Sequence, residues 1–156
     1  LAAIPQELDA VIAEMTGRRT TTRAGREFHV GDLAGARCVA VFSRWGKVAA
    51  ASTATELLLD HGVSAILFTG AAGSLSPAVR VGDIVVATGL AQHDMDASPL
   101  YPRGEVPLLG VSAFGTDPAL RGWEYRLVQR SLGSWTVRRE LPGEVLRRIA
   151  DCVVSR

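Results

Sequence analysis

The residues best suited to chemistry are one glutamate near the start, Glu7, and a run of small residues at 69–74. Glu7 falls in the first turn of an expected helix, just past the carboxyl end of the first expected strand. The run at 69–74 follows the apolar stretch 63–68, and no large side chain in it keeps a ligand from the backbone. Taken alone, each signal is better explained by a plain structural role. The carboxylate can complement a helix dipole, worth up to about 1 kcal/mol, and the run can be a tight turn.

The pattern around these residues predicts an α/β fold. A short apolar run that ends in a glycine-rich turn is typical of a buried parallel strand. We therefore expect a mainly parallel, twisted central sheet with 63–70 at its centre, helices on its faces and a ligand at its carboxyl edge. The other expected elements are helices over 5–16 and 46–61, a hairpin of strands 27–33 and 37–43 joined through Ala34-Gly35, a strand over 83–90, a helix beginning at Asp117, and a last helical pattern around 145–153. The first two helices should pack on the sheet through Leu8, Val11, Ile12, Val48, Leu57 and Leu58.

Composition limits the class of protein. The 156 residues suit one domain, and 47% hydrophobic with 21% charged residues indicates a soluble globular chain. No apolar run reaches the roughly 18 residues that span a bilayer, and no signal-peptide pattern is evident, which together favour a cytoplasmic location without membrane contact. A net charge of +1 argues against nucleic acid as a partner.

Metal and cofactor signals are weak. Cys38 and Cys152 lie far apart and are interpreted as small buried hydrophobic residues in a reducing compartment. His93, Asp94 and Asp96 are close in sequence but make a poor ligand set, so a solvated or interface loop is the preferred interpretation. We expect neither a metal nor a cofactor.

Four motifs occur in order along the chain. They are Ala3-Ile4-Pro5-Gln6-Glu7, Ser43-Arg44-Trp45-Gly46-Lys47-Val48-Ala49-Ala50, Phe68-Thr69-Gly70-Ala71-Ala72-Gly73-Ser74, and Val81-Gly82-Asp83-Ile84-Val85 followed by His93-Asp94-Met95-Asp96. As a set they resemble the purine nucleoside phosphorylase and nucleosidase superfamily, most closely its methylthioadenosine/S-adenosylhomocysteine nucleosidase branch. The resemblance covers residues 1 to about 120 of a single expected domain, 1–156, and residues 121–156 are divergent or truncated.

The resemblance implies a function and a set of site residues. By it, the chain would hydrolyse the N-glycosidic bond of 5′-methylthioadenosine or S-adenosylhomocysteine and release adenine, with Glu7 as the general base that activates water. It also implies a homodimer in which the loop at 93–103 walls the partner's pocket. The implied substrate-binding residues are Trp45, Ala71, Ala72 and Gly73, and the implied wall residues are Ala97, Leu100 and Tyr101.

Departures from the family pattern matter as well. Arg44 and Trp45 stand where the family commonly has glycine and a small aliphatic residue, which narrows the sugar side of the site. Phe68 and Ala71 occupy the places of the arginine and serine that hold phosphate in phosphorylases, so water is the expected nucleophile.

The ending departs furthest. The Met-Glu pair that grips the ribose and the Ser-Asp pair that protonates the purine do not occur after residue 120. A truncated or frameshifted product, missing segments and real divergence each explain this. The alternatives are therefore a non-catalytic nucleoside-binding or dimerisation module, or a related hydrolase or phosphorylase such as futalosine hydrolase.

Overall fold

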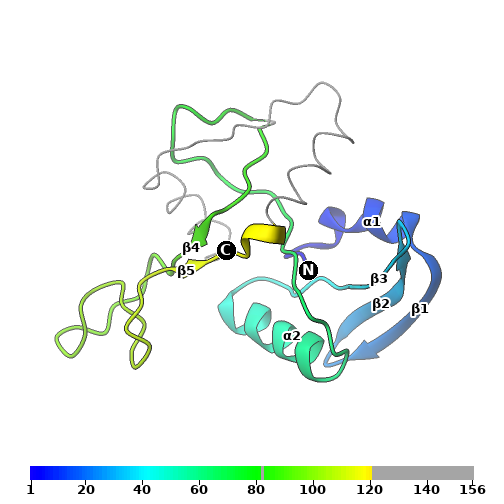
Figure 1. Cartoon of the computed structure of the whole chain (residues 1–156), viewed down its shortest axis with the longest axis horizontal. Helices are drawn as coiled ribbons and strands as arrows, with labels where there is room; N and C mark the ends of the chain where they lie inside the picture. Colours follow the sequence, from blue (N-terminus) through cyan, green and yellow to red (C-terminus); the bar gives the residue numbers. More distant parts are fainter. Residues whose placement is uncertain (82, 121–156) are drawn as a thin grey trace. The chain divides into compact units, whose positions relative to one another are not determined.

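The computed structural model describes residues 1–81 and 83–120 (Figure 1). These residues divide into two units, 1–71 in the first and the described residues of 72–120 in the second. Expected features after residue 120, including the helical pattern around 145–153 and Cys152, lie outside the described residues. No helix among the described residues is long and apolar enough to cross a membrane.

An antiparallel sheet of three strands forms much of the first unit. The strands β1 (Thr16–Arg23), β2 (Arg26–Leu33) and β3 (Ala36–Ala40) follow one another in chain order across the sheet. Ala34 and Gly35 join β2 to β3 with positive φ angles of 51° and 83°. The predicted hairpin is therefore confirmed, with its second strand ending at Ala40. The sheet gains β1, which the sequence pattern did not predict.

Strand β1 was missed for a physical reason. All eight of its residues are exposed, so it has no buried face and no alternation of apolar and polar positions. Its three consecutive threonines carry the β-branched preference for extended backbone, which is a weaker signal than burial. An exposed edge strand rich in arginine and threonine leaves little periodicity to detect.

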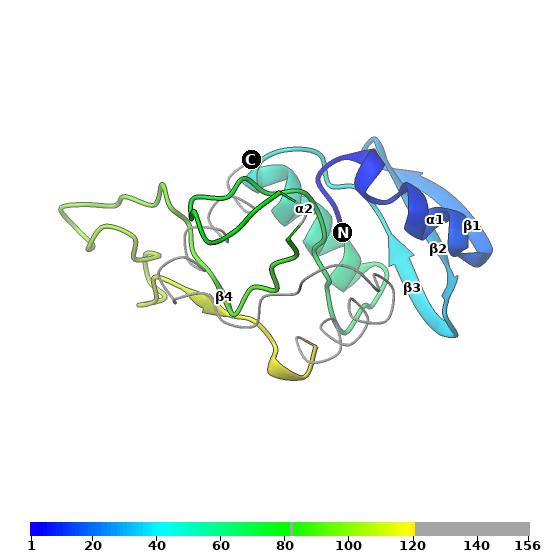
Figure 2. The same ribbon diagram turned by 90° about the horizontal axis from the view of Figure 1, so that it is seen from above.

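The expected helix over 5–16 is interrupted. A 3-10 turn, η1 (Pro5–Glu7), is followed by the short helix α1 (Asp9–Glu14), with Leu8 between them. Leu8 donates its amide to the Pro5 carbonyl at 2.8 Å, and its side chain is buried. Both views show α1 beside the sheet (Figures 1 and 2).

Helix α2 (Lys47–Leu59) confirms the helix expected over 46–61 to within two residues at its end. Leu57 is buried as predicted, but Val48 and Leu58, expected to pack on the sheet, are 85% and 51% exposed. The reason is geometric, because neighbouring helix positions point about 100° apart and only the face of Leu57 meets the sheet.

The core of the first unit joins the hairpin to α2. Phe28, Val41 and Leu57 form a buried cluster, and four partly buried side chains pack against it, namely Leu1, Val39, Val63 and Ile66. Full burial of side chains of this size contributes about 1.5–3 kcal/mol each. The ring of His61 stacks on Phe28 with centroids 4.9 Å apart, so the end of α2 is held against the same core.

The structure differs from the fold prediction at the segment 63–70, which the sequence pattern predicts as the central strand. It carries no strand assignment, and Leu67 and Phe68 are 37% and 38% exposed. Two hydrogen bonds tie it to the first residue: the terminal amino group of Leu1 donates to the Leu67 carbonyl at 2.9 Å, and Thr69 N–H donates to the Leu1 carbonyl at 3.0 Å. These two bonds follow the parallel pattern, and they are not enough for a strand to be assigned at 63–70.

The same N-terminal segment pairs in parallel on its other side. Ala2 N–H donates to the Val41 carbonyl at 3.2 Å, and Ser43 N–H donates to the Ala2 carbonyl at 2.7 Å. Residues 41–43, 1–2 and 67–69 therefore lie next to one another in parallel. The middle position belongs to residues 1–2, not to 63–70.

The second unit has little regular structure in its described part. Strands β4 (Gly89–Leu90) and β5 (Phe114–Gly115) form a two-stranded antiparallel ribbon. The strand expected over 83–90 is thus reduced to its last two residues. Asp117 begins a helix as predicted, because its Oδ1 accepts the amides of Ala119 and Leu120 at 2.8 and 3.0 Å.

Candidate active site

The carboxylate of Glu7 is held by backbone amides on two sides. Oε2 accepts hydrogen bonds from the N–H groups of Ala3 and Ile4 at 3.0 and 3.2 Å, the local half of a capping interaction. Oε1 accepts the N–H of Ala71 at 2.8 Å, across 64 residues of sequence. Glu7 therefore both caps the first turn and ties it to the small-residue run.

Gly70 lets this contact form. A Cβ atom at residue 70 would lie 2.8 Å from Oε1 of Glu7 and 3.0 Å from both Cδ and Oε2. Real side chains essentially never approach so closely. The structure thus brings two of the sequence-predicted site residues, Glu7 and Ala71, into direct contact. The contact is possible because Gly70, which precedes Ala71, has no side chain.

The parallel segments explain why these groups meet. Residues 41–43, 1–2 and 67–69 run in the same direction, so the chain leaves all three at one edge. The turn with Glu7 follows residues 1–2, Gly70 follows 67–69, and Arg44 and Trp45 follow 41–43. Ligands bind at such carboxyl edges in α/β proteins.

Trp45 is placed at this edge but extends into solvent. Its side chain is 74% exposed, and it stands one residue before Gly46, the N-cap of α2. Arg44 adopts a φ of 71° and donates a hydrogen bond to the Gly25 carbonyl in the turn between β1 and β2. No ring contact or hydrogen bond within residues 1–71 joins Trp45 to Glu7 or Ala71.

The other predicted site residues belong to the second unit. Ala72 and Gly73 are exposed, and a Cβ atom added at Gly73 would meet nothing within 4 Å. In the loop, the carbonyl of Ala97 accepts the amides of Leu100 and Tyr101, both at 3.1 Å. Leu100 is 85% exposed, whereas Ala97 and Tyr101 are half-buried.

Charge in the loop is arranged around Asp96. Oδ1 accepts hydrogen bonds from the hydroxyl and the amide of Ser98, and these lower the pKa of the Asp96 carboxyl, with a smaller contribution from Arg103. The Nδ1 atom of His93 lies 3.9 Å from Oδ1 of Asp94. Within 1–81 and 83–120, no three His, Cys, Asp or Glu side chains are grouped to hold a metal ion.

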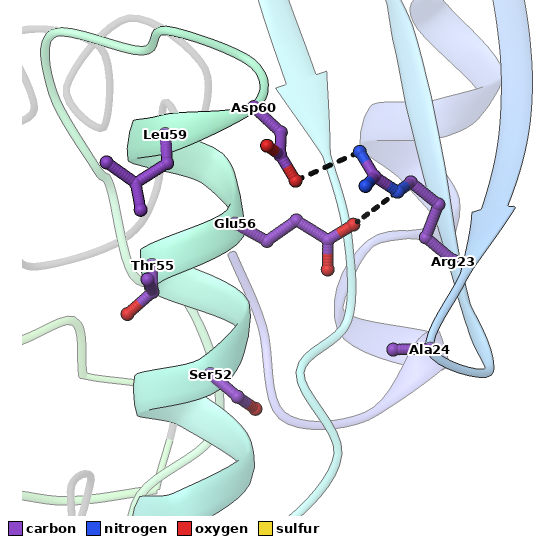
Figure 3. Close-up of a pocket in the computed structure, with 7 residues that line it drawn as sticks. All are labelled: Arg23, Ala24, Ser52, Thr55, Glu56, Leu59 and Asp60. Carbon is purple, nitrogen blue, oxygen red and sulfur yellow. Dashed lines mark ion pairs between the residues drawn. The ribbon is translucent and has the colours of Figure 1, made fainter.

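A surface pocket of about 340 Å³ lies elsewhere in the first unit (Figure 3). Arg23, at the end of β1, reaches across it to two carboxylates of the α2 end, Glu56 at 3.3 Å and Asp60 at 2.9 Å. The Glu56 side chain is 13% exposed, and its Oε1 accepts no hydrogen bond from the described residues. Figure 3 shows both carboxylates directed at the guanidinium, which fastens β1 to α2.

Two of these residues carry roles that the sequence analysis did not assign. Gly70 was recognised as part of a run of small residues, but its approach to Glu7 needs the tertiary contact. Arg23 gave no signal, because it stands in a strand that the pattern did not predict. The sequence does show that its two partners, Glu56 and Asp60, stand four residues apart and so share one face of the predicted helix.

Comparison with known proteins identifies the family of this chain. The profile of the Phosphorylase superfamily matches residues 1–123. The chain therefore belongs to the phosphorylase superfamily and has its nucleoside phosphorylase-like fold.

Individual relatives agree with this assignment. The chain is 35% identical over 121 residues to the 5′-methylthioadenosine/S-adenosylhomocysteine nucleosidase of Chromohalobacter salexigens, covering 77% of this chain and 51% of that protein. It is 39% identical over 84 residues to the aminodeoxyfutalosine nucleosidase of Helicobacter pylori, covering 53% and 36%.

A solved structure is similar as well. The methylthioadenosine/S-adenosylhomocysteine nucleosidase of Colwellia psychrerythraea, in complex with adenine, superposes with a TM-score of 0.81 at 30% identity, covering 87% of this chain and 56% of that one. The chain thus spans about half the length of the relatives it matches.

Proposed function

We propose that this chain carries the water-activating half of a purine nucleosidase that hydrolyses 5′-methylthioadenosine or S-adenosylhomocysteine and releases adenine. The observation that carries the proposal is the carboxylate of Glu7, fixed by three amides at the edge where the parallel segments end. The similarity to nucleosidases named for these substrates supports the substrate class.

In this proposal Glu7 is the general base. A carboxylate has about four acceptor sites, and three backbone amides take up three of them. The remaining site is available to a water molecule. Because Glu7 is held on two sides, the water would be aimed without the entropy cost of ordering a free side chain. The water then attacks the oxocarbenium-like sugar carbon as the bond to adenine breaks.

Water is the nucleophile in this proposal because the site offers little to hold phosphate. Phe68 and Ala71 stand at the positions where phosphorylases carry arginine and serine. Neither side chain can donate a hydrogen bond to an anion. The amide of Ala71, which would otherwise be free to do so, is already bound to the Glu7 carboxylate.

The remaining parts of the site belong to the same proposal. Ala71, Ala72 and Gly73 would lie against the ribose and base, and Trp45 beside the sugar. The enzyme would be a cytoplasmic homodimer whose loop residues Ala97, Leu100 and Tyr101 wall the partner's pocket. Residues 1–156 would form part of one domain built on a mainly parallel sheet, for which the pairing of 41–43, 1–2 and 67–69 is the local support.

Turnover by this chain is expected to be slow. Departure of adenine needs protonation of the ring, and a general acid supplies about 10²–10⁴ in rate. The sequence after residue 120 contains neither the Ser-Asp nor the Met-Glu pair of the family pattern. Without the ribose contacts, binding energy that would hold the sugar in its reactive geometry is lost as well.

A second candidate has its own support. The similarity to an aminodeoxyfutalosine nucleosidase favours a related nucleoside with a different 5′ substituent. Trp45 is large and exposed at a position where the family commonly has a small aliphatic residue. In this proposal a side chain of that size beside the sugar affects which 5′ substituent the site accepts. A non-catalytic nucleoside-binding or dimerisation module remains the alternative from another class.

Adenine release tests these candidates. The chain and its Glu7→Gln variant are incubated with methylthioadenosine, S-adenosylhomocysteine and aminodeoxyfutalosine, and adenine is quantified by chromatography. Slow release that depends on Glu7 supports the nucleosidase, and the preferred substrate selects between the two nucleosidases. Binding of methylthioadenosine by calorimetry without any release favours the module. Undiminished release by the Glu7→Gln variant removes Glu7 from the mechanism.

A further inference from the structure

Glu7 lies so close to Gly70 that a side chain added at residue 70 should affect the Glu7 carboxylate and not the fold. Gly70 has no positive φ, so an alanine can adopt its backbone conformation without strain. The atoms that an added Cβ would meet are the end of the flexible Glu7 side chain and not backbone. An alanine at residue 70 should therefore leave the fold intact and displace the carboxylate.

We propose that Gly70 is a positioning residue for Glu7: the missing side chain at residue 70 lets the carboxylate bind the amide of Ala71. The Oε1 atom of Glu7 lies 2.8 Å from both the Ala71 nitrogen and the position of the Gly70 Cβ. The same oxygen cannot keep the hydrogen bond and make room for a methyl group. The catalytic consequence rests on the proposed function, whereas the positioning itself does not.

The neighbouring glycine provides a matched control. Gly73 lies on the same small-residue run, and a Cβ atom added there meets nothing within 4 Å. Gly73→Ala changes the same residue type with the same added methyl group but creates no contact with Glu7. A difference between the two variants in the Ala71 amide, beyond the small change that an alanine at the preceding residue makes to its intrinsic shift and exchange rate, is then due to the contact at residue 70.

The experiment follows the Ala71 amide by NMR in the 156-residue chain. Proton shift and hydrogen exchange are measured in the wild type, Gly70→Ala, Gly73→Ala, Glu7→Ala and the double variant of Gly70→Ala with Glu7→Ala. Gly70→Ala and Glu7→Ala should each shift the Ala71 proton upfield and speed its exchange by about tenfold or more. Because both remove the same hydrogen bond, the double variant should show no further change, and Gly73→Ala should match the wild type.

Three results would overturn the proposal. One is an unchanged Ala71 amide in Gly70→Ala, and another is an additive effect in the double variant. The third is loss of protection throughout α2 and the sheet, which would make Gly70 a residue of the fold. Absence of adenine release from the wild-type chain would count against the proposed function alone, because the Ala71 amide reports positioning without turnover.

Discussion

The side-chain carboxylate of Glu7 accepts the backbone amide of Ala71 at 2.8 Å, and this hydrogen bond joins the first turn of the chain to a run of small residues 64 positions later. Its other oxygen is bound by the amides of Ala3 and Ile4. A residue proposed as a general base therefore also holds its surroundings in place. Substitutions at Glu7 should affect structure and chemistry together, and the two effects need separate measurements.

Glu7→Gln should destabilise the first unit. Glutamine offers one acceptor oxygen, so its NH₂ group must face either the Ala71 amide or the pair from Ala3 and Ile4, a donor against a donor. We expect a loss of about 1 kcal/mol or slightly more in the free energy of unfolding, measured by urea denaturation. Glu14→Gln, at the exposed end of α1, should change it by less than about 0.5 kcal/mol. Equal stability of the two variants would contradict the structural role of Glu7.

Arg23→Gln should loosen β1 from α2. The substitution removes the cation from Glu56, whose side chain is 13% exposed, and leaves a mostly buried carboxylate without its ion pair. We expect a loss of about 1–2 kcal/mol, measured by thermal or urea denaturation. Asp60→Asn should cost less, because the Asp60 side chain is 43% exposed and its pair is screened by water.

The matched control for that experiment lies in the same strand. Arg19 is an exposed residue of β1, and Arg19→Gln should be nearly neutral. If Arg19→Gln and Arg23→Gln reduce the free energy of unfolding equally, the ion pairs of Arg23 across the pocket add no stability of their own.

Arg44 offers a test of backbone strain. Its φ of 71° is unfavourable for a residue with a side chain, and its guanidinium offsets part of that cost by donating to the Gly25 carbonyl. Arg44→Ala keeps the strained backbone and loses the hydrogen bond, whereas Arg44→Gly relieves the strain. The glycine variant should therefore be more stable than the alanine variant by about 1 kcal/mol in urea denaturation. Alanine equal to or better than glycine would show that the left-handed conformation carries no cost.

The loop predicts a measurable pH effect. Hydrogen bonds from Ser98 lower the pKa of Asp96, so Ser98→Ala should move that pKa upward toward its usual value. A lowered carboxyl pKa stabilises the folded loop above the unfolded pKa, and this stabilisation is lost as pH falls through the folded pKa. Ser98→Ala should therefore reduce the acid sensitivity of the loop. A carboxyl ¹³C NMR titration measures the shift, and an unchanged Asp96 midpoint would contradict it.

Sequence by itself determined the family and much of the local structure. The order of the motifs containing Glu7, Trp45 and Gly70 led to the superfamily that the comparisons show. Turn chemistry at Ala34-Gly35, helical spacing through Leu57 and the cap at Asp117 are all local, and each appears in the structure where it was expected. Such signals survive because they depend on neighbours a few residues away.

Tertiary structure decided what depends on distant partners. Residues 63–70 have the composition of a buried strand, but a strand also needs a hydrogen-bonding neighbour, and in the described part of the chain the parallel pairing of this segment is limited to two hydrogen bonds with Leu1. The exposed strand β1 forms without an apolar face because β2 pairs with it. Gly70 gains its meaning only from the carboxylate of Glu7 beside it, since a close approach of two atoms is set by the fold and leaves no periodicity in the chain.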